Sequence, residues 1–268
     1  GFQKTPIDLE VSVPPKNARR NIMQIRYEMS QSSFYDIPGN IIAYWVSISK
    51  ISCFRNGIKI DSIADARQGI IPGNVEAFLR LWYEVKNDNI GFNHHVYEDI
   101  VRYGKKWFPY NKGGAFRRWY GNLEYVINMK NNGYDIKFSG LNNNYRLREP
   151  KFYFKQCISW SKISSGLFSM RFLPEGTLFD IAGCCIFELK QNELYVLALL
   201  NSVVILSLME FMGATLNFEV DQIKKIPVIF TDEKKDLIDR YAENNIIMCK
   251  DDWDSFETSW DFKKHPLI

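Results

Sequence analysis

The sequence lacks the motifs that mark the common cofactor-binding and nucleotide-binding enzymes. It contains no G-x-G-x-x-G, no phosphate-binding P-loop and no G-x-S-x-G. The one Pro-Pro pair, Pro14-Pro15, lies between Val13 and Lys16, and neither neighbour could accept a hydrogen bond from a substrate amine. The acidic pairs at positions 61/65 and 98/99 are not followed by E-x-K, so we interpret them as helix caps and surface charges. We therefore expect no catalytic residue in this chain.

Cysteine is scarce, and its pattern indicates neither disulfides nor a metal. The five cysteines are an odd number, form no C-x-x-C, and include the adjacent Cys184 and Cys185. This usage is typical of a reduced, cytoplasmic protein in which cysteines serve as small apolar residues. His94 and His95 belong to no metal-ligand pattern, so we expect no metal site.

Long hydrophobic runs are also missing. Residues 1–10 hold no apolar stretch of the signal-peptide type. The longest apolar run, residues 194–212, is interrupted by Asn201, Ser202, Ser207 and Glu210, which favours a buried helix over a membrane span. We therefore expect no membrane partner.

Composition is that of a globular protein whose charge is unevenly distributed. The 268 residues suffice for one large domain or two small ones, and 46% are hydrophobic and 24% charged. Aromatic residues reach 15%, which indicates a thick core more readily than stacking surfaces for bases. The net charge is only +3, but residues 102–155 hold twelve Lys or Arg against three acids, a local +9. Such a basic centre is consistent with a phosphate-binding surface or with a solvated basic face.

Hydrophobic periodicity predicts a mixed α/β (α+β) fold in which several strands precede one dominant helix. We expect strands at 21–29, 41–46, 78–85, 119–129, 152–160, 168–172 and 179–187, with a hairpin turn at 131–133. Residues 107–114, rich in aromatics and glycine, are expected to form a loop. Helices are expected at 47–56, 220–225 and 232–244, with one long buried helix at 191–212 capped by Gly213. Residues 1–230 would form one domain, and 231–268 a helical C-terminal portion with a surface tail.

The segment 112–120 combines three properties that suit DNA binding. Its glycines let backbone N–H groups approach a phosphate closely. Its cations can bind phosphate or a guanine edge, and its adjacent Trp and Tyr are flat platforms for a sugar or an unstacked base. A loop whose aromatics fill the core and whose charges are solvated would have the same composition. The DNA-binding candidates here are Lys112, Gly113, Gly114, Arg117, Arg118, Trp119 and Tyr120.

A second candidate for base reading is the asparagine-rich segment 142–148. Asn pairs with adenine and Arg with guanine in the major groove, although Asn runs are also ordinary loop filler. Residues 159–165 supply hydroxyls and a lysine for phosphate contacts that set the register on DNA. The tight turn Arg67-Gln68-Gly69 could contact DNA or a neighbouring domain. The further DNA-binding candidates are Asn142, Asn144, Arg146, Arg148, Lys155 and Lys162.

Several blocks of the chain resemble a known family, the BREX phage-defence DNA adenine methyltransferases of the PglX type. The blocks are I-P-G at 37–39, A-Y-W-V-S at 43–47, R-Q-G at 67–69, F-L-R-L-W at 78–82, K-W-F-P-Y-N-K-G-G at 106–114, I-S-W at 158–160 and D-D-W-D-S-F-E-T-S-W-D-F at 251–262. They match the middle-to-C-terminal region of that family and extend from about residue 20 to the end. The segments L-L-N-S at 199–202 and I-K-K-I-P at 223–227 are similar to specificity domains of restriction-modification systems. Where family members often have T-G-D-N, this chain has I-P-G-N at 71–74, which argues against a role for a hydroxyl or carboxylate in that loop.

The resemblance implies a function for a longer bacterial protein. That protein would transfer a methyl group from S-adenosylmethionine to N6 of adenine in a short site. Its catalytic domain would lie N-terminal to this chain, and this chain would hold no cofactor itself. The chain would be the target-recognition domain, reading double-stranded DNA while the target adenine is flipped into the catalytic pocket.

Two other classes remain open from the residues alone. In one, the chain is a protein-interaction module whose aromatic surface and 253–262 tail dock other subunits of a defence complex. In the other, it is a free-standing nuclease, which would require a metal-binding carboxylate cluster that we do not expect.

Overall fold

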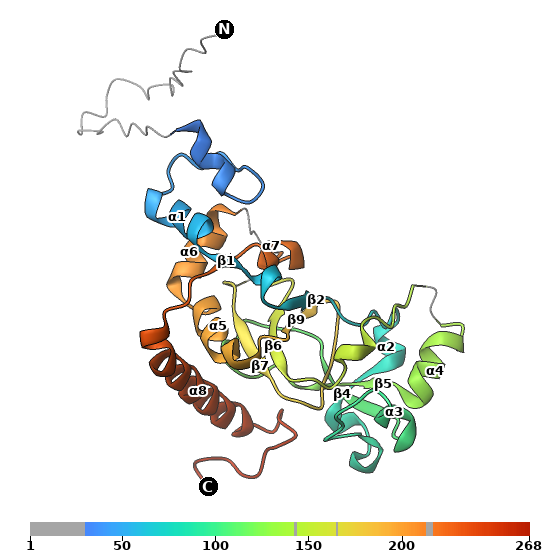
Figure 1. The fold of residues 1–268 in the computed structure, drawn as a ribbon. Coiled ribbons are helices and arrows are strands. Elements are labelled where there is room, and N and C mark those ends of the chain that lie inside the picture. The colour runs from blue at the N-terminus through green and yellow to red at the C-terminus, as the bar shows by residue number, and fades with distance from the viewer. Residues whose placement is uncertain (1–29, 142–143, 165, 213–216) are drawn as a thin grey trace, which may run out of the picture.

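The structure is a computed structural model, and it describes residues 30–141, 144–164, 166–212 and 217–268. Its strands and helices confirm the predicted mixed α/β class. Two four-stranded sheets, ordered β2-β9-β6-β7 and β3-β5-β4-β8, form the centre, and a two-stranded sheet, β1-β10, lies beside them. Figure 1 shows α8 running along the outside of α5 near the first sheet, whereas α2, α3 and α4 gather around the second. The strand expected at 21–29 and the cap expected at Gly213 lie outside the described residues.

The strands are short and most of the helices are single turns to three turns long. The strands are β1 (Ile58–Lys59), β2 (Asp65–Arg67), β3 (Leu79–Leu81), β4 (Trp107–Asn111), β5 (Tyr125–Asn128), β6 (Cys157–Ser161), β7 (Met170–Leu173), β8 (Leu178–Phe179), β9 (Gly183–Phe187) and β10 (Pro227–Val228). The helices are α1 (Ile48–Asn56), α2 (Val75–Phe78), α3 (Asp99–Arg102), α4 (Lys130–Phe138), α5 (Glu193–Leu200), α6 (Val203–Phe211), α7 (Val220–Lys224) and α8 (Asp232–Asp254).

Strand β9 lies between two hydrophobic cores, which explains why all five of its residues are buried. Because successive strand side chains point to opposite faces, Cys184 and Ile186 enter the core that contains α5 and α6. Cys185 and Phe187 enter the core that contains the second sheet. The two adjacent cysteines therefore face away from each other and remain free thiols.

The aromatic stretch that follows residue 106 is a strand, and the prediction of a loop at 107–114 was wrong for its first five residues. All five residues of β4 are buried, and β4 pairs antiparallel with β5 and parallel with β8. A strand covered on both faces reads as a continuous apolar run instead of an alternating one. The loop begins only at Lys112, so the glycines at 113 and 114 follow a strand that holds them in place.

The long helix expected at 191–212 is two helices, and this expectation was wrong. Helices α5 and α6 are bent by 69° at a break between them. At the break, Asn201 donates from Nδ2 to the carbonyl of Met170 (3.0 Å) and accepts at Oδ1 from the N–H of Met170 (2.9 Å). Ser202 then caps α6 by accepting from the N–H of Ile205. The polar pair stops the helix because its side chains bond to β7 and to the new helix end.

Helices α5 and α6 cover the apolar run that was expected to be a buried helix and not a membrane span. No single helix among the described residues is long and apolar enough to cross a membrane. The bent pair formed by 190–200 and 203–210 has sufficient length and apolar composition only when its two helices are taken together. Helix α5 packs against β6, β7 and α8.

Other element boundaries also differ from the predictions. The strand expected at 119–129 is limited to Tyr125–Asn128. Residues 131–133 all have positive φ and lie near the start of α4, so no hairpin strand follows them. Residues 41–46 form no strand, because they turn without a pairing partner among the described residues. Helix α8 extends ten residues beyond the expected end at 244, since Trp253 reaches into the second core.

Strands β1 and β10 join distant parts of the chain. Ile58 pairs with Val228, and the N–H of Ile60 donates to the carbonyl of Ile226 at 3.1 Å. Helix α1 begins one residue later than predicted, ends at Asn56 as predicted, and packs against β10. The expected helix at 220–225 is also present, as α7.

Candidate nucleic-acid interface

The aromatic pair expected to stack on bases is largely built into the interior. Tyr120 is only 3% exposed, lies beneath the Lys250 ammonium at 5.4 Å, and has a phenol pKa raised by burial. Trp119 is half-buried against the first core, and its backbone bonds to β7 through Met170 (2.9 Å) and Phe172 (2.7 Å). Tyr120 therefore cannot serve as a stacking platform in this conformation, which corrects that expectation.

The two glycines of the same segment differ in their surroundings, and Gly113 packs closely against the backbone of Ala182. Gly113 has a φ of +80°, and its N–H donates to Asn111 Oδ1 at 3.2 Å. A Cβ atom at Gly113 would lie 2.8 Å from the carbonyl oxygen of Ala182. The Gly113 N–H is thus already used within the chain and is not free for a phosphate. Gly114 has a φ of +138° and is exposed.

The cations of segment 112–120 differ in how far they are already occupied. The Arg117 guanidinium lies 4.8 Å from the centre of the Trp253 ring and 3.5 Å from Asp252 Oδ2, so it contacts the end of α8. Arg118 lies over Phe116 at 5.5 Å, and its buried Nε has no hydrogen-bond partner in the described part of the chain. Lys112 lies over the Tyr125 ring at 4.5 Å. Arg117 therefore has a packing role, whereas Lys112 and Arg118 remain candidates for phosphate contacts.

Of the remaining candidates, one is neutralised and one cannot be placed. Lys162 Nζ lies 3.1 Å from Glu219 Oε2 and its side chain is only 22% exposed. Asn142 lies outside the described residues, and Asn144 is exposed next to it. Lys162, like Arg117, therefore already has a carboxylate partner within the chain.

One predicted residue, Lys155, lies with two further cations around the ring of Phe152. Lys151, Lys155 and Arg67 place their charged groups 4.5, 5.6 and 6.0 Å from its centre. Phe152 itself stacks on Phe187 of β9 at 4.4 Å, which fixes the group to the first sheet. We call the following five residues the basic surface: Arg67, Arg146, Arg148, Lys151 and Lys155.

Backbone hydrogen bonds position the part of the basic surface that contains Arg146 and Arg148. Arg146 exchanges hydrogen bonds with Ile71 at 2.8 and 2.9 Å, and Arg148 donates to Gln68 Oε1 at 3.4 Å. Both arginine side chains are exposed. The turn Arg67-Gln68-Gly69, noted in the sequence, therefore lies directly beside segment 146–148.

Segment 69–71 is itself anchored in the interior. A Cβ atom at Gly69 would lie 2.0 Å from the Phe179 carbonyl oxygen, so only glycine fits there. The Tyr110 hydroxyl donates to Asp180 Oδ2 at 2.5 Å and also lies 3.3 Å from the Ile70 carbonyl oxygen. Burial is the main cause that raises the pKa of Asp180. This buried contact fixes the loop that carries Gln68 relative to the second sheet.

Carboxylates neutralise only part of the basic surface. Asp65 lies 2.6 Å from Arg67 and 4.0 Å from Lys151, and Glu149 lies 3.8 Å from Arg67. Within the described ranges, Arg146, Arg148 and Lys155 form no ion pair. The charge available to an anionic partner is therefore concentrated on these three side chains.

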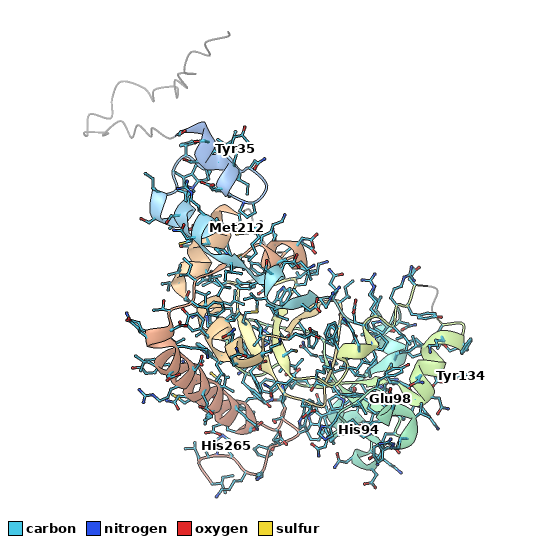
Figure 2. The ribbon with its side chains drawn as sticks, in the orientation of Figure 1. Tyr35, His94, Glu98, Tyr134, Met212 and His265 are labelled. Atoms are coloured by element: carbon cyan, nitrogen blue, oxygen red, sulfur yellow. The ribbon has the colours of Figure 1, made fainter. Side chains whose placement is uncertain are left out.

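Two hollows adjoin the basic surface and share Tyr97, Pro150 and Tyr153 as walls. The first, which we call the tyrosine hollow, has a volume of about 330 Å³ and is also lined by Met129, Lys137, Tyr145, Arg146 and Leu147. The second, the lysine hollow, has a volume of about 240 Å³ and is also lined by His95, Val96, Glu98, Lys151 and Lys155. Figure 2 labels Glu98 and, on α4, Tyr134, which mark the end of the molecule where the hollows lie.

Sequence reasoning missed the aromatic members of these hollows. Tyr97, Tyr145 and Tyr153 come from three separate segments, and nothing in their spacing connects them. The Tyr153 hydroxyl is buried and has no hydrogen-bond partner among the described residues, and burial also raises its pKa. The only available signal was the local charge excess, because Lys137 and Lys151 fall within the basic region 102–155.

Comparison with known proteins gives two relatives and no family model that matches. The chain is 38% identical over 248 residues, 90% of its length, to the adenine-specific methyltransferase PglX of Lacticaseibacillus casei (strain Zhang). It is 35% identical over 258 residues, 94% of its length, to the adenine-specific methyltransferase BrxX of Escherichia coli O9:H4 (strain HS). The chain spans 20% of the length of each relative. The resemblance found in the sequence is thus confirmed: the chain is homologous to one region of the adenine-specific methyltransferases PglX and BrxX.

Proposed function

We propose that this chain is the DNA target-recognition module of an S-adenosylmethionine-dependent DNA adenine-N6 methyltransferase of a phage-defence system. The observation that carries the proposal is the basic surface, because three exposed cations, which have no carboxylate partner among the described residues, lie beside aromatic hollows. The homology to PglX and BrxX supports DNA as the partner. The catalytic domain and the S-adenosylmethionine site belong to another part of the longer protein.

The residues of the basic surface divide into two roles. Arg148 and Lys155 contact phosphates and fix the register of the duplex without reading its sequence. Arg146, on a backbone ladder with Ile71, presents a planar guanidinium suited to the O6 and N7 edge of guanine. Asn144 lies two residues before it and is the candidate for adenine. Lys112 and Arg118 are further candidates for phosphate contacts.

The experiment is fluorescence anisotropy of the chain with a labelled random duplex at several salt concentrations between about 50 and 200 mM. Each phosphate contact contributes roughly 0.9 to the slope of log affinity against log salt. The double variant Arg148→Ala/Lys155→Ala should therefore weaken binding and reduce the slope by roughly 1.8. The matched control is Lys234→Ala/Arg240→Ala on α8, which also removes two exposed charges and should change neither quantity.

A second function, docking of other protein subunits, has its own supporting observation. Large apolar side chains are exposed around the end of the molecule that contains α1 and α6 (Figure 1), among them Trp45, Ile48 and Val203 at 53%, 79% and 77%. Exposed apolar groups of this size are typical of interaction surfaces. Binding to such a surface would be nearly indifferent to salt, so the same titration separates the two functions.

A further inference from the structure

We propose that the tyrosine hollow binds a single unpaired nucleotide of the DNA, with its base against the tyrosine rings and its phosphate on the lysines of the adjoining hollow. This inference rests on the proposed DNA-binding function and adds a defined ligand site to it. Nothing in the basic surface alone requires such a site.

The shape of the hollow favours one base over a base pair. Its volume of about 330 Å³ is at the lower end of the range for small-molecule sites. A paired duplex offers only base edges to a protein, whereas an unstacked base offers its face. Tyr97 and Tyr153 lie 5.8 Å apart with ring planes at 60°, and Tyr145 forms a further wall. Flat rings in a concave site match the face of an unpaired base.

A buried hydroxyl supplies the second observation. Tyr153 is 2% exposed and lines both hollows, yet its hydroxyl has no partner in the described part of the chain. Buried hydroxyls are nearly always hydrogen-bonded, so an unpaired one marks a place where water or a polar group of a ligand can bind. A phenol both donates and accepts, and every nucleobase carries ring nitrogens or exocyclic groups that could pair with it.

The charges around the hollows suit a phosphate. Lys137 and Arg146 line the tyrosine hollow, and Lys151 and Lys155 line the lysine hollow. Glu98 is the one carboxylate among the lining residues, which leaves a clear excess of positive charge. A nucleotide joins an aromatic base to an anion, whereas an apolar peptide would leave Lys137, Arg146 and Lys155 without an anionic partner among the described residues.

The test compares two duplexes of the same sequence, one fully paired and one with a single unpaired 2-aminopurine. Anisotropy of a terminal label measures affinity, and 2-aminopurine emission reports stacking. We expect the bulged duplex to bind about tenfold more tightly and its emission to fall on binding. Tyr145→Ala should abolish both effects while leaving the affinity for the paired duplex within about twofold.

Two further variants keep the test independent of folding. Tyr153→Phe retains the ring and removes only the hydroxyl, so it should reduce the preference for the bulged duplex by about threefold to tenfold and keep the quenching. Tyr134→Ala, on α4 and outside both hollows, is the matched control and should behave as the unmodified chain.

The outcomes separate this inference from the function on which it depends. Equal binding of both duplexes without quenching would overturn the nucleotide site and leave the DNA-binding function standing. A preference for the bulge that survives both Tyr145→Ala and Tyr153→Phe would place the nucleotide elsewhere and also overturn it. Failure of both duplexes to bind at low salt would refute the DNA-binding function and the site together.

Discussion

Replacing Arg117 with alanine is expected to weaken the fold more than it weakens DNA binding. From the sequence, Arg117 is a phosphate contact, but in the structure its guanidinium lies on the Trp253 ring at 4.8 Å and near Asp252 at 3.5 Å. Both partners belong to α8, and Trp253 is buried in the second core. Arg117 therefore connects the 112–120 segment to the last turn of that helix.

The size of the effect follows from the exposure of these groups. A cation–π contact at an exposed site contributes about 0.5–1 kcal/mol. The ion pair contributes only a few tenths of a kcal/mol, because Asp252 is 63% exposed and solvent screens it. With the packing of the arginine stem, Arg117→Ala should cost about 1–2 kcal/mol. For a chain of this size that corresponds to a fall in Tm of roughly 2–8 °C.

Thermal denaturation followed by circular dichroism measures this fall, and Arg240→Ala, an exposed arginine on α8, is the control that should leave Tm unchanged. Arg117→Lys keeps the charge but loses the planar stack, so it should fall between the two. If Arg117→Ala left Tm unaltered and abolished DNA binding, the guanidinium would be free for phosphate in solution and the packing role would be wrong.

Three further predictions concern buried groups. Gly69→Ala would place a Cβ atom 2.0 Å from the Phe179 carbonyl oxygen, so we expect a loss of more than about 4 kcal/mol, seen as a failure to give folded protein by circular dichroism. Tyr153→Phe removes a buried hydroxyl that has no partner among the described residues, and it should raise the free energy of urea unfolding by about 1 kcal/mol; a decrease would reveal a further partner. Because burial raises the pKa of Asp180 in the fold, its protonated form favours the folded state, and this contribution is lost as pH rises above the unfolded value of 3.8 through the raised pKa. Asp180→Asn should therefore flatten the dependence of unfolding free energy on pH in that window, and an unchanged slope would contradict the assignment.

The fold class could be predicted from the sequence because hydrophobic periodicity reflects burial, but element boundaries depend on distant partners. Asn201 and Ser202 were visible as polar interruptions of an apolar run. Their effect, a bend of 69°, depends on the hydrogen bonds that Asn201 makes to Met170 in another strand. No local pattern contains that pairing.

The candidate site, too, could be predicted only where the signal lies in the local sequence. The charge excess of 102–155 includes four of the five residues of the basic surface, Arg146, Arg148, Lys151 and Lys155, and the role of that region in DNA binding stays a prediction. The segment 112–120 was overvalued because an aromatic residue beside arginines has the same composition whether it is exposed or, like Tyr120, buried. The tyrosines of the hollows could not be found, because tertiary packing alone brings their three segments together.

The pairing of β1 with β10 can form only late in the synthesis of the chain. Ile58 and Val228 are separated by about 170 residues, and ribosomes add roughly 5–20 residues per second. The first strand must therefore wait about 8–34 s before its partner leaves the ribosome. Throughout that interval helix α1 lacks β10, against which it packs, and its apolar side chains are open to chaperones or to other nascent chains. A run of slow codons between residues 59 and 227 would lengthen this vulnerable period.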